Sequence, residues 1–266
     1  MLRRSLEWLA RGRTIVRRLP REMGAARLHL TPDSQLKYLR PGRAGFEAKL
    51  LAQVAILVKP STPVWDIGAN VGVFAFAAAG LAGASGRVLA VEPDPWLFGL
   101  LQRSRAANRE RGLAEIELLC AAVADRPGVA RFGIAARGRA SNALLGLGGS
   151  RTGGVREELL VPTVTLDQLL EASFAPALVK IDVEGAELLA LRGAERLLRE
   201  VRPRLLIEVA ETNADAVTEL LRAARYRLFD AAEPERGLRP IGRAVWDTFA
   251  VPEERTEEAR APMPHS

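Results

Sequence analysis

Short, continuously apolar runs alternate along the chain with longer segments whose apolar residues recur every three or four positions. The apolar runs predict buried strands and the longer segments predict helices. Strands are expected over residues 64–67, 87–91, 116–122, 178–181 and 205–209, and helices over 46–58, 71–81, 95–108, 165–171 and 187–200. This alternation is typical of a parallel sheet with helices on both faces, so the sequence predicts an α/β fold.

The last part of the chain departs from this repeat. A helix is expected over residues 214–224, followed by strands over 226–230 and 245–251 with only a turn-rich stretch between them. Two strands without a helix between them favour an antiparallel closing hairpin.

The first 30 residues are rich in arginine, and their leucines and valines recur at roughly helical spacing. This pattern predicts a basic amphipathic helix, followed by a linker at Pro32, Pro41 and Gly42. Such a helix would allow weak contact with an anionic membrane, although packing over the main domain is the favoured interpretation. The predicted parts are therefore a basic helical extension and linker (1–45), a main domain (46–252) and a polar tail (253–266).

Composition narrows the class of protein. The chain has 266 residues, of which 48% are hydrophobic and 26% charged, so it can bury a core. Its single cysteine, Cys120, excludes an intramolecular disulfide and favours a reducing, cytoplasmic setting. The formal net charge of +6 comes mainly from arginine, and the most apolar window, residues 71–86, is shorter than the roughly 20 residues of a membrane span.

The segment VWDIGANVG (64–72) predicts a strand that enters a glycine turn and then a helix. In α/β folds this arrangement brings the backbone close to a ligand at the carboxyl end of the sheet. Gly68 and Gly72 permit the tight turn, so we expect Gly68, Ala69, Asn70 and Gly72 to bind a cofactor.

Glu92 ends the second strand and is followed by Pro93, and a carboxylate there can accept both ribose hydroxyls of a nucleoside cofactor. NAD and S-adenosylmethionine both fit that role. Asp66, expected at the mouth of the glycine turn, would repel a pyrophosphate but suits the ammonium and sulfonium of S-adenosylmethionine. The turn also lacks the Gly-Lys-Ser/Thr ending of a triphosphate site. We therefore predict S-adenosylmethionine as the cofactor.

Five motifs in this order resemble the FkbM-type methyltransferase family. They are DIGANVG (66–72), VEPDP (91–95), TLDQL (165–169), KIDVEGAE (180–187) with LRG (191–193), and RPRLLIE (202–208). The resemblance implies a class I, Rossmann-like fold with a seven-stranded, mostly parallel sheet whose last strand is antiparallel. It also implies S-adenosylmethionine as methyl donor and, as acceptor, an oxygen on a sugar or polyketide-like product.

Lys180, Asp182 and Glu184 lie around the end of the fourth predicted strand, beside the crevice where such sheets bind ligands. Methyl transfer needs an acceptor oxygen held in line and a base that removes its proton. Asp182 is the first candidate for that base and Glu184 the second, while Lys180 would orient the carboxylate or simply pair with it. Glu184 and Glu187 could instead charge the first turn of the following helix. No spacing specifies a metal site.

The acceptor side of the predicted site is less defined. Asp125 could approach the adenine edge or initiate a turn before Pro127 and Gly128. Ser141 and Asn142 resemble a polar pair of the family, and the glycine-rich loop 146–154 suits either a lid or a surface excursion. Glu208 resembles the family's glutamate, but Ala210 stands where the family often has a histidine or an aromatic residue.

The sequence favours O-methylation of a hydroxyl on a sugar, glycan or polyketide-like small molecule. An RNA methyltransferase is the first alternative, which the absence of an Asn/Asp-Pro-Pro-aromatic loop after the fourth strand and an aromatic content of only 5% disfavour. A non-catalytic protein that binds an adenosine cofactor is the second, because binding and turnover are separable. The acceptor and the oligomeric state do not follow from the sequence.

Overall fold

A mixed central sheet forms the framework of the protein, for which the computed structural model describes residues 9–146 and 154–259. Across the sheet the strands are β13 (Arg239–Ile241), β12 (Tyr226–Asp230), β14 (Asp247–Pro252), β11 (Arg204–Glu208), β10 (Leu178–Ile181), β3 (Pro63–Ile67), β4 (Arg87–Val91) and β5 (Glu115–Leu119). The five strands from β11 to β5 are parallel, whereas β14 is antiparallel to both of its neighbours. This is the predicted class I topology with one additional edge strand, β13, which lies in the turn-rich stretch.

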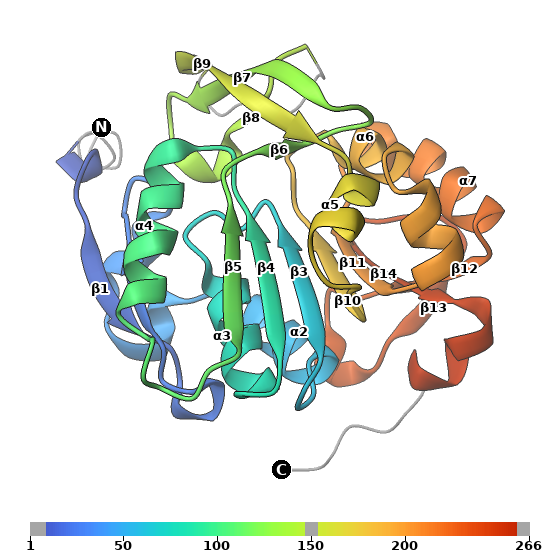
Figure 1. The fold of residues 1–266 in the computed structure, drawn as a ribbon, viewed down its shortest axis with the longest axis horizontal. Coiled ribbons are helices and arrows are strands. Elements are labelled where there is room, and N and C mark those ends of the chain that lie inside the picture. The colour runs from blue at the N-terminus through green and yellow to red at the C-terminus, as the bar shows by residue number, and fades with distance from the viewer. Residues whose placement is uncertain (1–8, 147–153, 260–266) are drawn as a thin grey trace.

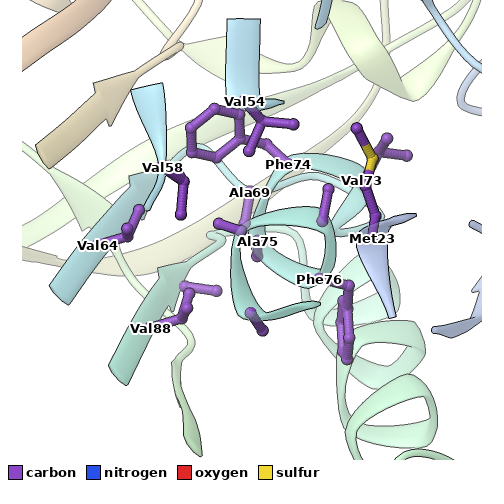
Figure 2. Packing of buried hydrophobic residues seen from close by; sticks show 14 of the residues in the cluster. Met23, Val54, Val58, Val64, Ala69, Val73, Phe74, Ala75, Phe76 and Val88 are labelled. Atoms are coloured by element: carbon purple, nitrogen blue, oxygen red, sulfur yellow. The ribbon is translucent and has the colours of Figure 1, made fainter. Parts of the chain in front are cut away.

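Helices cover both faces of the sheet. They are α2 (Ala48–Leu57), α3 (Val73–Ala82), α4 (Pro95–Ala106), α5 (Leu166–Ala172), α6 (Glu187–Arg192) and α7 (Ala214–Ala223). Alternate residues of β3 serve the two layers: Val64 packs with α2, α3 and α4, while Trp65 and Ile67 pack with α5, α6 and α7. Figure 2 shows the first of these layers, with valines of β3 and β4 directed toward α2 and α3.

The predicted helix over residues 187–200 is interrupted. α6 ends at Arg192 and a π-helical turn, Leu197–Val201, follows it. A Cβ atom on Gly193 would lie 2.4 Å from the carbonyl oxygen of Ala124, so the backbone of another segment touches the chain at this point. The close contact therefore needs a glycine at this position.

A second, smaller sheet lies across the end to which the arrows of β3, β4 and β5 point (Figure 1). Its strands, in order, are β6 (Ala122–Val123), β9 (Val155–Val164), β7 (Gly128–Ala135) and β8 (Ala143–Leu144). The sequence predicts one strand over 116–122 and no further strand before residue 178, so this sheet was missed. Its small core consists of Ala122, Phe132, Ile134, Leu144, Val161 and Ala186. Most of the predicted lid, residues 147–153, lies outside the described residues.

The N-terminal segment is a hairpin rather than a helix over residues 15–30. β1 (Ile15–Arg18) pairs antiparallel with β2 (Arg27–Leu30). The predicted basic helix is wrong here because Pro20 and Gly24 (φ +72°) form the turn, and because the burial of β2 alternates between exposed and buried residues. Residues 15–30 therefore do not form the amphipathic helix on which the predicted weak membrane contact depended. Residues 1–8 lie outside the described part of the chain.

The predicted linker is ordered and packed. Thr31, Asp33, Ser34 and Tyr38 are buried, and two short 3-10 turns follow, at Leu36–Leu39 and Gly42–Gly45. This segment therefore belongs to the main body of the protein.

The start of the predicted polar tail is also ordered. Residues Glu253–Ala259 form 3-10 turns, and Arg202 binds Glu254 through two hydrogen bonds. Residues 260–266 lie outside the described part of the chain.

Two helical glycines provide a test of the N-terminal hairpin. A Cβ atom on Gly80 would lie 2.1 Å from the carbonyl oxygen of Met23, whereas one on Gly99 would meet nothing within 4 Å. Gly80→Ala should therefore destabilise the protein despite the higher helix propensity of alanine, while Gly99→Ala should stabilise it by up to about 1 kcal/mol. Urea unfolding of both variants measures the difference, and equal stabilisation by both would show that the hairpin does not pack against α3.

Candidate active site

Two clefts open at the carboxyl end of the parallel strands, beneath and beside the small sheet. The first, the glycine-loop cleft, encloses about 550 Å³ of open space between the glycine turn, Glu92 and the small sheet. The second, the charged cleft, spans about 970 Å³ of space open to solvent, and its lining includes three lysines and four carboxylates. The two clefts share Gly68, Asn70, Ala140, Asp182 and Glu184. The two clefts therefore adjoin each other.

The glycine turn brings the ends of β3 and β10 into direct contact. Gly68 has a φ of +80°, and a Cβ atom there would lie 1.8 Å from the carbonyl oxygen of Asp182. Only glycine allows this approach. Ala69 donates its N–H to the carbonyl of Val91 (3.0 Å), and Gly72 donates to Ala69 (2.8 Å), so the turn is also tied to β4. The strand, turn and helix predicted for this segment are all present.

Glu92 lies at the floor of the glycine-loop cleft with only 4% of its surface exposed. One carboxylate oxygen accepts a hydrogen bond from the backbone N–H of Asn70 (2.7 Å), and the other accepts from Asp94 N–H (2.9 Å). Burial raises the pKa of Glu92 to about 8. The two backbone donors fix the carboxylate in place, and Pro93 lines the cleft beside it.

An ion cluster closes the glycine-loop cleft on the side of the small sheet. The guanidinium of Arg139 binds Asp94 and also donates to Asp33 at 3.0 Å. Asn142 donates to Asp94 as well (2.9 Å), and Arg156 makes two hydrogen bonds to Asp33. These residues tie the small sheet to the first turn of α4 and to the segment after β2. Of them, Asn142 was singled out from the sequence and Asp94 lies within the VEPDP motif, whereas the other charged residues lie in no motif.

Lys180 is buried between two carboxylates. Its ammonium nitrogen lies 3.0 Å from Asp182 and 3.6 Å from Asp66, with 4% of the residue exposed. Burial alone would lower the pKa of Lys180, but the charges of Asp182 and Asp66 raise it, so the ammonium stays protonated.

Asp66 does not lie at the mouth of the glycine turn, where the sequence predicts it. It is completely buried, lines neither cleft, and pairs in register with Lys180 on the neighbouring strand. Burial raises the pKa of Asp66. The carboxylates that line both clefts are instead Asp182 and Glu184.

Asp182 and Glu184 follow β10, which ends at Ile181, so strand alternation does not continue to Glu184. A left-handed backbone at Glu184 (φ +45°) nevertheless places this residue in the lining of both clefts. Burial, reinforced by the charge of Asp182, raises the pKa of Glu184 to about 8. Glu187 is buried and accepts hydrogen bonds from Gly185 N–H (2.6 Å) and the amide of Asn213 (2.7 Å), which is a structural role.

Asp125 lies away from both clefts. It is exposed in the turn between β6 and β7 and lines neither of them. The turn interpretation therefore fits, and Ala121, Ala122 and Val123 line the glycine-loop cleft in its place. Small apolar residues, and not a charged side chain, therefore form this wall of the glycine-loop cleft.

The charged cleft contains several residues that no motif indicates. Lys37 binds Glu47 at 2.8 Å, and Lys49 binds Asp247 at 2.7 Å. Trp246, half exposed, completes the lining. These residues come from the supposed linker, from the start of α2 and from the residue before β14, and only the folded chain brings them together.

Two further properties concern the described residues alone. Within residues 9–146 and 154–259, no helix is long and apolar enough to cross a membrane. In the same residues, no group of three or more His, Cys, Asp or Glu side chains has the arrangement of a metal site.

The topology of the central sheet, with its glycine turn and clefts at the carboxyl end, is that of a class I methyltransferase. The Methyltransferase FkbM domain model matches residues 66–228, which is more than half of the chain. The chain therefore belongs to the FkbM methyltransferase family, and the resemblance of its motifs is confirmed. A comparison with curated proteins gave no match.

Solved structures with a similar fold include several methyltransferases. The methyltransferase FkbM from Methylobacillus flagellatus KT is 18% identical with a TM-score of 0.46; the match covers 82% of this chain and 57% of that one. A SAM-dependent O-methyltransferase from Thermotoga maritima is 15% identical with a TM-score of 0.41, covering 83% and 70%. The Pyrococcus abyssi tRNA (uracil-54, C5)-methyltransferase, in complex with S-adenosyl-L-homocysteine, is 16% identical with a TM-score of 0.40, covering 73% and 34%.

The buried carboxyl of Glu92 should make stability depend on pH. In the unfolded chain a glutamate loses its proton near pH 4.5, whereas folded Glu92 keeps it up to about pH 8. The folded state therefore loses stability as the pH rises between these values, and Glu92→Gln should remove about 2 kcal/mol or more of that loss. Urea unfolding at pH 5 and pH 8 measures it. The exposed Glu219→Gln serves as the control, and a wild-type slope in Glu92→Gln would refute the assignment.

Proposed function

We propose that this protein transfers a methyl group from S-adenosylmethionine to a hydroxyl oxygen of a sugar, glycan or polyketide-like small molecule. The observation that carries the proposal is the shared boundary of the two clefts at Gly68, Asp182 and Glu184. A donor in the glycine-loop cleft and an acceptor in the charged cleft would meet there. The cytoplasmic setting expected from the single Cys120 belongs to this proposal.

The glycine-loop cleft has the features that S-adenosylmethionine needs. The carboxyl group of Glu92, oriented by two backbone donors, would form hydrogen bonds with the ribose hydroxyls. Apolar residues such as Val91, Val123 and Phe132 would surround the adenine ring. At the opposite end, the Asp182 carboxylate suits the positive charge of the methionine part and would repel a pyrophosphate. When bound, the cofactor supplies an electrophilic methyl group.

Asp182 is the group best placed to take the proton from the acceptor hydroxyl. It lines both clefts, and Lys180 holds its carboxylate at 3.0 Å. As the acceptor oxygen becomes nucleophilic, its proton would pass to Asp182. Glu184 is the second candidate, but because burial raises its pKa to about 8, it holds its own proton over most of the neutral range. Lys180 is a positioning residue in this scheme.

The two alternatives receive less support. Phosphates of an RNA would have to enter a cleft whose three lysines are already paired with carboxylates and which also contains the unpaired Glu208, so no free cation among the described lining residues would receive them there. A protein that only binds the cofactor would not need a second polar cleft that shares residues with the first. Methylation is therefore the function that the geometry favours.

Replacing Asp182 separates binding from chemistry. Asp182→Asn is nearly isosteric, and S-adenosylhomocysteine lacks the sulfonium charge, so the affinity for it should fall by no more than about tenfold, whereas methyl transfer should fall by about 10²-fold or more beyond that loss. Binding is measured by calorimetry. Transfer is measured by mass spectrometry after incubation with isotopically labelled S-adenosylmethionine and extracts of bacterial glycans or polyketides.

The exposed Asp215→Asn, on the first turn of α7 and lining neither cleft, is the matched control. Wild-type methylation by Asp182→Asn would exclude Asp182 as the base. Absence of S-adenosylhomocysteine binding by the wild type would refute the assignment of the cofactor.

A further inference from the structure

Trp246 presents an aromatic surface to the charged cleft while its backbone is firmly held. Trp246 is 52% exposed, more than any other large hydrophobic residue in the lining. Its carbonyl accepts a hydrogen bond from Val209 N–H (2.9 Å), and the next residue, Asp247, is buried and bound by Lys49 and Gln53. The indole is therefore an open surface on a rigid support, which is what a stacking platform for a ligand requires.

The lysines of the charged cleft are already neutralised by carboxylates of the protein. Lys37 binds Glu47 at 2.8 Å, Lys49 binds Asp247 at 2.7 Å, and Lys180 binds Asp182 at 3.0 Å. No cation in the described lining is left over to recognise an anionic acceptor. A phosphate or carboxylate on the acceptor would have to break one of these pairs.

Two carboxylates of the charged cleft, Glu184 and Glu208, have no such partner among the described residues, and of these only Glu208, at the end of β11, lies outside the glycine-loop cleft. Among the described residues its side chain makes no hydrogen bond and no ion pair within 4.0 Å, although the residue is only partly exposed. It lines the charged cleft but not the glycine-loop cleft, so it is not among the groups that would face the cofactor. A partly buried carboxylate without a cation is unfavourable, and a cationic ligand would relieve that cost.

We propose that Trp246 and Glu208 select the acceptor, and that this acceptor is a sugar ring carrying an ammonium group. The indole stacks on the apolar C–H face of the ring, and the Glu208 carboxylate pairs with the ammonium. The remaining charged side chains around the cleft bind the hydroxyls at the ring edge. This inference rests on the proposed function, because it assumes that the charged cleft holds the acceptor.

Calorimetry on the full chain saturated with S-adenosylhomocysteine tests the proposal with three probes of one ring shape and different charge. These are methyl glucosaminide, methyl glucoside and methyl glucuronide. We expect the glucosaminide to bind about tenfold more tightly than the glucoside, and the glucuronide to bind most weakly.

Variants assign the effect to the two side chains. Trp246→Ala should weaken glucosaminide binding about tenfold and Trp246→Phe by no more than about threefold, because phenylalanine keeps an aromatic face. Glu208→Gln should reduce the affinity for the glucosaminide to that for the glucoside and leave the glucoside unchanged. Leu160→Ala, which truncates an exposed residue that lines neither cleft, is the control and should change no affinity.

The proposal would be overturned if the glucoside or the glucuronide bound as tightly as the glucosaminide, or if none of the three probes bound. An unchanged affinity of Trp246→Ala for the glucosaminide would also overturn it. Binding of S-adenosylhomocysteine is measured in the same experiment before any sugar is added. Its loss in the wild type would refute the proposed function, whereas its presence without sugar selectivity would refute only the assignment of Trp246 and Glu208.

Discussion

The structure depends on a buried ammonium group at the carboxyl end of the central sheet. Lys180 and Asp66 occupy paired positions on adjacent strands, so both side chains lie on one face of the sheet, and Asp182 completes the group from the following turn. Removing a single member of such a cluster would leave an uncompensated charge in the protein interior. The cluster therefore constrains β3, β10 and the turn after β10 to one arrangement, and both clefts are built around that arrangement.

A second constraint comes from segments that lie outside the repeating core. Asp33, in the segment after β2, and Asp94, at the start of α4, are joined by Arg139 of the small sheet. Three parts of the chain that are distant in sequence thus meet through one guanidinium, which also lies 5.1 Å from the ring of Trp96. The N-terminal segment is consequently a structural component of the site.

The sequence predicts the repeating core well because each of its elements carries a local signal. The buried strands are continuous apolar runs, and Gly68 and Glu92 stand at fixed places after two of them. The N-terminal hairpin was mistaken for a helix because, over a short span, its arginines and leucines fit the period of a helix as well as that of a strand. Only the turn at Pro20 and Gly24 decides between the two. The small sheet was missed because its strands pair mainly with one another rather than with the core, and two of them are only two residues long.

The residues of the candidate site also divide into those that belong to motifs and those that do not. Motif residues such as Asp182 and Glu184 were predicted correctly as part of the cleft lining. Asp66 and Asp125 were also predicted, but Asp66 is buried and Asp125 is exposed, and neither lines a cleft. Lys49 and Trp246 were not found, because a single lysine in a helix and a single tryptophan before a strand have no distinctive spacing. Their proximity is a consequence of tertiary structure alone.

The lining of the charged cleft has a consequence for how members of this family should be compared. Lys37, Glu47, Lys49 and Trp246 all lie outside residues 66–228, the part that the family model matches. Two proteins could share every motif that defines the family and still differ in all four of these residues. Membership would then inform us about the methyl donor, while part of the choice of acceptor would depend on the flanking segments, which could diverge without disturbing the framework of the fold.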